Sequence, residues 1–329
     1  MTHKSLSRWM ASRCEAMRSP HERIYLFYFF LLLSSFSLCC SARAAALECP
    51  DCEVSDAKRA QCDRALVLTP AQRTASETKH VAYGMPRAAA NATSEHLLHQ
   101  RDYLTWYDDD LRVPLWVAYK LSRANVNTER DRLNCFRRDP RLPDDAAAEC
   151  LDYNEPAYDQ GHLAPNSDFQ QSELAMINTY PYSNMTPQHK EFNEHTWSRL
   201  ESWVRIWTQK RGDLFVITGA VFDQNNDHVR DDDNAARRVP PRNRVAIPTH
   251  FYKIIFKKKA LGASDSIAIL LPHDNAKHTG DAWIDYMTAH ITTIGEIQRV
   301  TGVDFLPGVT GSKRTALENF KAPTLWAKE

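Results

Sequence analysis

The chain has 329 residues, of which 43% are hydrophobic and 25% charged, and it carries 41 basic and 41 acidic side chains. This composition is ordinary for a globular protein, and no internal repeat or long low-complexity tract is visible, which excludes repeat and low-complexity classes. The first 44 residues hold six basic and two acidic side chains, which leaves 35 basic and 39 acidic side chains in the rest. Such a mildly acidic body does not favour nucleic acid over its whole surface, so phosphate binding would require a local basic cleft.

The N-terminal region contains an apolar run at residues 24–38, with basic residues before it and Ala42-Arg43-Ala44 after it. The run is short for a bilayer span and suits the core of a signal peptide with an Ala-x-Ala cleavage site. We therefore expect residues 1–44 to be a signal peptide and the mature chain to be secreted or periplasmic, without stable membrane association. An Arg- and Ser-containing arm is also compatible with a mitochondrial presequence, so a mitochondrial location is the alternative.

Residues 45–95 are polar and irregular, and they are expected to form a Cys-containing N-terminal extension. In an oxidising compartment we expect Cys135 and Cys150 to form a disulfide, which would stabilise the loop between them by about 3 kcal/mol. Three further cysteines would remain after cleavage: Cys49, Cys52 and Cys62. One of them would be left unpaired, and the sequence does not identify which.

Aromatic and β-branched runs predict five strands, the first two joined by an acidic turn at residues 108–110. The predicted strands are residues 103–107, 115–119, 214–222, 245–256 and 266–271. Lys257-Lys258-Lys259 follows the fourth of these strands. We interpret the three lysines first as a charged guard on an edge strand and second as a nucleic-acid contact.

Two helices are predicted. Thr186 has the features of an N-cap with Pro187 at the first helical position, and this helix would stop at Gly212. Residues 282–300 are predicted to form the second helix. Together the elements predict an α+β fold over residues 96–329, one domain with an antiparallel central sheet flanked by helices.

Polar side chains gather on one segment and on the helix that follows it. Around Gly161 the chain has the pattern of a strand that turns sharply, with His162 projecting from the turn. In the helix, four residues recur at every fourth position: Asn193, Trp197, Glu201 and Arg205. This spacing places them on one slowly drifting stripe. We expect Trp197 to be part of the core and the other three side chains to serve chemistry.

The segment Asp159-Gln160-Gly161-His162 resembles the Asp-Arg-Gly-His motif of the DNA/RNA non-specific endonucleases, the ββα-metal nucleases that include endonuclease G. Further segments occur in the family's order at residues 113–119, 183–188, 218–220, 245–253 and 297–302. The similarity extends from about Arg101 to Pro307 and implies a ββα-metal nuclease core. One position departs from the family, because Gln160 stands where the family usually has arginine.

The resemblance implies a metal-dependent, sugar-non-specific endonuclease that hydrolyses phosphodiester bonds of DNA and RNA without strong sequence preference. A neutral imidazole can accept a proton from water, and the resemblance gives this general-base role to His162. One Mg²⁺, with Mn²⁺ as the alternative, would stabilise the phosphate and the leaving group. Because Mg²⁺ keeps much of its water, the amide of Asn193 could be its single protein ligand, with His195 as the rival ligand.

The resemblance also gives roles to four other side chains. Glu201 would accept hydrogen bonds from metal-bound waters, and Arg205 would face the phosphate as a fixed positive charge. Asp159 would orient the turn or the water network. The family places an electrophilic arginine in the loop at residues 121–150, and we choose Arg132 among the five arginines from Arg130 to Arg141. Homodimers are common in the family.

Two other functions stay open at this point. The amide of Gln160 in place of a guanidinium favours a catalytically weakened nucleic-acid-binding protein, because a charge that could stabilise the transition state is missing. The Cys-rich N-terminal segment favours instead a secreted, disulfide-stabilised module without enzymatic activity. Binding without cleavage would establish the first alternative, and replacement of His162 by alanine separates the second from an enzyme, since only an enzyme would lose a large rate factor.

Overall fold

The computed structural model describes residues 56–64, 66–88, 95–257 and 263–327. The chain divides into the units Met1–Pro50 and Asp51–Glu329, and all described residues belong to the second unit. The predicted signal peptide at residues 1–44, together with Cys49 and Cys52, lies outside the described residues. Within the described part of the chain, no helix is both long and apolar enough to cross a membrane.

The centre of the fold is a seven-stranded sheet with the order β10-β9-β8-β7-β4-β3-β2. All neighbouring strands are antiparallel. The strands are β2 Glu95–His99, β3 Leu104–Asp108, β4 Val113–Leu121, β7 Leu214–Val221, β8 His250–Phe256, β9 Ser266–Pro272 and β10 Ile291–Thr292. The predicted antiparallel central sheet is therefore confirmed.

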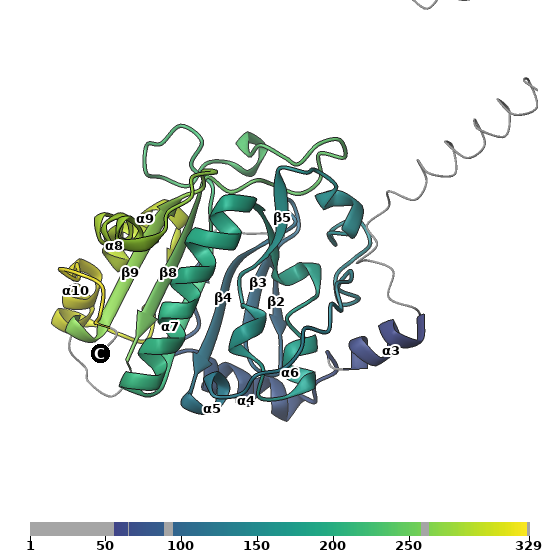
Figure 1. Cartoon of the computed structure of the whole chain (residues 1–329), viewed down its shortest axis with the longest axis horizontal. Helices are drawn as coiled ribbons and strands as arrows, with labels where there is room; N and C mark the ends of the chain where they lie inside the picture. Colours follow the sequence, from purple (N-terminus) through teal and green to yellow (C-terminus); the bar gives the residue numbers. More distant parts are fainter. Residues whose placement is uncertain (1–55, 65, 89–94, 258–262, 328–329) are drawn as a thin grey trace, which may run out of the picture. The chain divides into compact units, whose positions relative to one another are not determined.

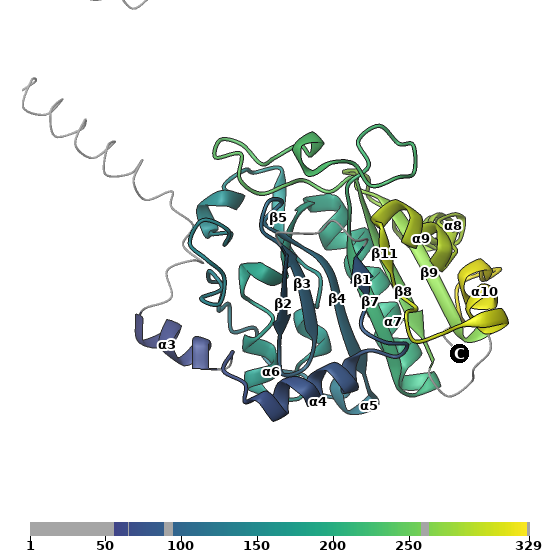
Figure 2. The same cartoon turned by 180° about the vertical axis from the view of Figure 1, so that it is seen from behind.

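The middle strands β4, β7 and β8 are buried along almost their whole length, because both faces of the sheet are covered. Figure 1 shows α7 lying across one face, and Figure 2 shows α4, α9 and the short ribbon β1–β11 on the other. The described helices are α3 Asp56–Arg64, α4 Pro70–His80, α5 Arg123–Val126, α6 Glu173–Ile177, α7 Ser198–Arg211, α8 Gly280–Ala289, α9 Ile294–Thr301 and α10 Gly311–Asn319. The ribbon pairs β1 Arg87–Ala88 with β11 Val303–Asp304. The α+β fold class is confirmed.

A separate two-stranded hairpin, β5 Tyr158–His162 and β6 Met185–His189, carries the segment with the histidine turn. The prediction that Thr186 and Pro187 begin a helix is wrong, since both lie in β6. Thr186 is opposite Gly161 and Pro187 is opposite Gln160. β6 pairs only with β5, so it tolerates a proline, which has no N–H to donate to a second neighbouring strand. The pairing of the two strands therefore overrides the helix-start pattern of Thr186 and Pro187.

Two predicted elements have different limits from those expected. Residues 245–249 are not part of a strand, since β8 begins at His250. The single helix predicted at 282–300 is two helices, because α8 ends before its C-cap His290 and the next residues pair with β9 as β10. Helix α9 then begins behind the N-cap Thr293, whose side chain accepts a hydrogen bond from the backbone N–H of Glu296.

The disulfide of the described residues joins Cys62 in α3 to Cys135, with 6.7 Å between their Cα atoms. The predicted Cys135–Cys150 disulfide is therefore wrong, although Cys150 is itself disulfide-bonded. Helix α3 lies against the loop that contains Cys135, and there the buried guanidinium of Arg137 donates to Asp63 at 2.7 Å. The pairing depends on where α3 docks, which the spacing of cysteines along the chain does not encode.

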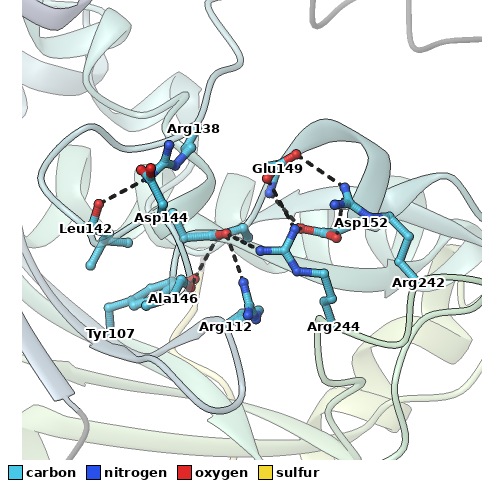
Figure 3. A network of polar contacts seen from close by, with 12 residues as sticks. Tyr107, Arg112, Arg138, Leu142, Asp144, Ala146, Glu149, Asp152, Arg242 and Arg244 are labelled. Atoms are coloured by element: carbon cyan, nitrogen blue, oxygen red, sulfur yellow. Dashed lines mark hydrogen bonds and ion pairs between the residues drawn. The ribbon is translucent and has the colours of Figure 1, made fainter.

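The long loop after β7 is tied to the segment that leads into β5, as Figure 3 shows. Arg242 reaches Glu149 and Asp152 at 3.3 Å each. Arg244 reaches Glu149 at 3.2 Å and Asp152 at 3.5 Å. The carboxylate of Asp152 is buried, so these two arginines supply the charge that compensates its burial. The contacts fix the approach of the chain to β5.

Candidate active site

The imidazole of His162 is enclosed by aromatic rings at the end of β5. Phe136 and Tyr180 pack edge-on against it, with centroid distances of 5.6 and 5.5 Å. Its Nε2 atom is buried and has no hydrogen-bond partner within the described ranges. Burial first, and the positive charge of Arg132 second, lower the pKa of His162 to about 3. The ring is therefore neutral near pH 7, with a nitrogen able to accept a proton.

The position before His162 requires glycine because β6 passes close to it. A Cβ atom on Gly161 would lie 2.2 Å from Cδ of Gln188, whose side chain is fully buried. The missing side chain of Gly161 thus lets β6 approach β5 and sets the position of the histidine turn. This is a requirement for space, since the backbone of Gly161 is not in the left-handed region.

Asn193 meets the same strand from a distant part of the chain. It lies in the π-helical turn Phe192–Trp197, and its Nδ2 donates to Oδ2 of Asp159 at 2.9 Å. The carboxamide oxygen accepts no hydrogen bond from the described residues. Asp159 and His162 are three residues apart on β5, a span of about 10 Å. The structure therefore brings the amide of Asn193 against β5, three residues before His162.

Asn193 and Asp159 together present oxygen donors that suit a hard divalent cation. Within the described residues, no three side chains of His, Cys, Asp and Glu are grouped as a metal site. Mg²⁺ needs few protein ligands because it keeps several waters, so one amide oxygen beside a carboxylate fits it. His195, the rival ligand, forms an ion-pair contact of 3.3 Å with Glu191.

Arg132 is the arginine of its loop that acts on His162. It is exposed, and its charge contributes to the lowered pKa of the histidine. The other four arginines of the loop are held by protein acceptors: Arg130 by the carbonyl of Gln170, Arg137 by Asp63, Arg138 by Asp144 and Arg141 by Asp139. Arg132 is thus the one of these five that remains available to a ligand near the imidazole.

Arg205 does not stand alone on the helix stripe. Its Nη1 donates to Oδ1 of Asp168 at 3.0 Å, and Tyr119 donates its hydroxyl to the other oxygen of that carboxylate at 2.9 Å. Burial alone would lower the pKa of Arg205, but the charges of Asp168 and Glu201 raise it. The guanidinium is therefore a fixed positive charge held in place by a buried carboxylate.

Glu201 lies near an ammonium group inside the sheet. Lys253 of β8 is fully buried, with Nζ 3.2 Å from Oγ1 of Thr218 and 4.5 Å from the ring centroid of Trp197. Burial raises the pKa of Glu201, and the charge of Lys253 opposes this rise. Burial lowers the pKa of Lys253 in turn, while Glu201 opposes that fall. The two groups thus stabilise each other's charged form.

The π-turn before α7 affects the alignment of the polar stripe. In a regular α-helix, residues spaced by four drift steadily around the axis because a turn takes 3.6 residues. A π-turn takes more residues per turn, so the step from Asn193 to Trp197 offsets part of this drift. Trp197 is 1% exposed and belongs to the core, as predicted. Asn193, Glu201 and Arg205 keep partly exposed side chains.

The family model of the DNA/RNA non-specific endonucleases matches residues 81–312. The chain belongs to this family. It is 34% identical over 192 residues to the mitochondrial nuclease EXOG of Danio rerio, which is 57% of this chain and 53% of that protein. It is 29% identical over 229 residues to mitochondrial endonuclease G of Homo sapiens, covering 69% of this chain and 73% of that protein.

Other relatives of this nuclease family differ in size and name. Venom phosphodiesterase 2 of Crotalus adamanteus is 25% identical over 256 residues, and the match covers 72% of this chain but 31% of the venom protein. The chain thus spans about half the length of the EXOG relative and a third of the venom relative.

Two residues near the polar stripe of this family member were not predicted from the sequence. Asp168 holds Arg205, and Lys253 lies beside Glu201. A signal for Lys253 does exist, because it is a lysine within the otherwise hydrophobic run Phe251 to Phe256. A charged residue at a core position of a strand requires a partner. No comparable pattern marks Asp168.

Proposed function

We propose that the protein is a metal-dependent, sugar-non-specific endonuclease that hydrolyses phosphodiester bonds of DNA and RNA. The observation that carries the proposal is the meeting of two segments on β5, where Asn193 contacts Asp159 three residues from His162. Family membership supports the same reaction class.

In this proposal His162 is the general base. Its neutral, buried imidazole takes a proton from the attacking water, and the aromatic rings of Phe136 and Tyr180 hold its plane. The amide oxygen of Asn193 would hold the divalent cation. When bound, the cation would stabilise the negative charge on the phosphate and on the leaving oxygen. Asp159 fixes the orientation of Asn193 through their hydrogen bond.

Three further side chains act by charge. Arg205, fixed by Asp168, faces the phosphate. Glu201 accepts hydrogen bonds from waters around the cation in its ionised form; burial raises its pKa to about 7, and the charge of Lys253 opposes this rise. Arg132 supplies positive charge on the side of His162. Because these groups recognise phosphate and not bases, cleavage has little sequence preference and weakens with salt.

The decisive experiment incubates supercoiled plasmid and total RNA with the purified chain and Mg²⁺. We expect both to be degraded, and expect EDTA to stop the reaction. His162→Ala should lose roughly 10²-fold or more in rate, because the general base is gone. The matched control is His96→Ala, which should keep its activity. His96 lies on β2, is partly exposed and pairs with Asp109.

Parallel assays with Mg²⁺, Mn²⁺ and Ca²⁺ identify the metal. Asn193→Ala should raise the Mg²⁺ concentration needed for half-maximal rate, whereas a folded Asn193→Ala protein with an unchanged metal requirement would refute this ligand. Plasmid that is bound in a gel shift but not cut would instead establish the catalytically weakened binding protein, which Gln160 favours.

We also propose that the protein works outside the cytosol. The Cys62–Cys135 disulfide supports this, because such bonds persist in oxidising compartments. The periplasm or the medium is the first proposed location, and the mitochondrion is the second. The names of the EXOG and endonuclease G relatives, both called mitochondrial, support the second. Fractionation of cells that express the full chain decides between these locations.

A further inference from the structure

A basic cleft of about 610 Å³ lies at the C-terminal end of α7. It is lined by five cationic side chains and one carboxylate: Lys79, Lys120, Arg123, Arg211, Lys257 and Asp213. The cations come from α4, β4, α5, α7 and the residue after β8, so the fold gathers them from five separate segments. This concentration of positive charge contrasts with the mildly acidic composition of residues 45–329.

Only two of the five cations pair with carboxylates among the described residues. Lys79 reaches Asp102 at 3.1 Å, and Lys120 reaches Asp213, the one acidic residue of the lining, at 2.7 Å. Both pairs are partly exposed, so water screens them. The charge of the remaining three cations is not balanced within the cleft.

Two of these three cations are held in place without being neutralised. Arg123 donates to the carbonyl of Gln209 at 2.9 Å, and the guanidinium of Arg211 lies 4.8 Å from the ring centroid of Trp326. Lys257 has no ion pair within the described ranges. Carbonyl and aromatic contacts fix the position of a cation while leaving its positive charge for a ligand. The cleft is therefore prepared for an anion.

The position of Lys257 directly after β8 excludes its interpretation as a charged guard on an edge strand. A lysine at the end of an edge strand prevents pairing between sheets. However, β8 lies between β7 and β9 and is not an edge strand, so the edge-guard interpretation of this lysine is wrong. Its side chain contributes instead to the lining of the basic cleft.

We propose that the basic cleft binds the phosphate backbone of the nucleic-acid substrate at a distance from the bond that is cut. This inference rests on the proposed nuclease function. Asn193 and Arg211 are 18 residues apart on one helical segment, or about 27 Å at the α-helical rise. Figure 1 shows α5 and the C-terminal end of α7 at the opposite end of the sheet from β5. A duplex covers that distance with about eight base pairs.

The consequence is a preference for long substrates. A duplex shorter than about eight base pairs on either side of the cut cannot reach both the site at β5 and the basic cleft. A longer duplex engages both sites, and once one site is bound the second contact forms within the same complex, which strengthens binding. We therefore expect kcat/KM to rise with substrate length beyond this threshold.

The test compares a hairpin with an 8-base-pair GC stem and one with a 30-base-pair stem, at fixed salt. The ratio of kcat/KM between the long and the short stem should fall at least fivefold in Lys257→Gln/Arg211→Gln. Lys257→Gln alone should show a smaller fall in this ratio. This single variant replaces the double variant in the test if loss of the contact between Arg211 and Trp326 unfolds the protein. Arg64→Gln removes one exposed charge from α3 and should leave the ratio unchanged.

A binding measurement gives an independent readout. In the His162→Ala background, the slope of log Kd against log salt for the long stem should decrease by about 2 when both cleft cations are removed. An unchanged slope and an unchanged length ratio would overturn the basic cleft as a substrate contact. An equal effect of Arg64→Gln would also overturn it, since the charge would then act generally. Failure of the wild type to cut either stem would instead refute the nuclease function.

Discussion

At the scale of single residues, the candidate catalytic residues are more predictable from the sequence than the groups that support them. His162 and Asn193 are recognisable because each belongs to a dense local pattern, and the structure brings Asn193 to Asp159 on the strand that ends at His162. Asp168 and Lys253 act through contacts across the fold, to Arg205 and beside Glu201. Long-range contacts of this kind leave little trace in a single sequence, so these two residues could not be assigned beforehand.

Gln160 gives the first prediction at this scale. It is half-buried, and strand alternation places its side chain on the same face as His162. Gln160→Arg should leave turnover unchanged or raise it, by up to on the order of 10²-fold if no other group replaces the missing charge. Single-turnover cleavage of a plasmid measures this, with Gln160→Met as the neutral control. A marked fall in Gln160→Arg would contradict the assignment.

Gly161 gives the second prediction. Gly161→Ala forces its new methyl group against Gln188, so it should lower the free energy of unfolding by about 2 kcal/mol, as overpacking does. Gly161→Ala/Gln188→Ala removes the obstruction and should recover part of the loss. Urea denaturation of both variants measures the difference. Equal stability of Gly161→Ala and the wild type would show that β6 can move away.

At the scale of elements, prediction is most reliable where a hydrophobic run has clear ends. The strands at β3, β4, β7 and β9 are confirmed because each is a hydrophobic run with clear ends. The errors occur where local signals compete with tertiary pairing. Thr186 and Pro187 resemble a helix start but pair with β5, and Ile291 and Thr292 interrupt a helical pattern because they pair with β9.

The disulfide between α3 and the loop before β5 gives a prediction for an element. Cys62 and Cys135 are 73 residues apart, so Cys62→Ala should lower the free energy of unfolding by about 2–4 kcal/mol. It should also lower kcat, because Cys135 adjoins Phe136, which packs against the ring of His162. Urea denaturation and plasmid cleavage measure the two effects. Loss of stability with full kcat would show that α3 does not support the histidine.

At the scale of the whole molecule, we expect buried neutral histidines to set the response to acid. Burial lowers the pKa of His80, His162 and His273 to about 3 each. His80 accepts a hydrogen bond from the backbone N–H of Lys120, and His273 accepts one from that of His189, so protonation breaks these bonds. Unfolded histidines bind protons near pH 6.5, which the folded state does not.

Stability should therefore be greatest above pH 6.5 and fall as the pH decreases from 6.5 towards 3. Urea midpoints at pH 7.0, 5.5 and 4.5 measure this decline. His80→Gln keeps an acceptor for the Lys120 N–H but has no proton to gain, so its midpoint should depend less on pH than that of the wild type. An equally steep decline of the urea midpoint with falling pH in both proteins would assign the acid sensitivity to groups other than His80.

The fully enclosed ammonium of Lys253 also offers a way to observe motion in this molecule. An amine-reactive acylating reagent modifies exposed lysines quickly but cannot reach this one while the ring of Trp197 covers it. Its modification rate, followed by peptide mass spectrometry, therefore reports how often the segment with Trp197 moves away from β8. A substrate analogue that clamps the hairpin and α7 together would slow this labelling without touching the lysine.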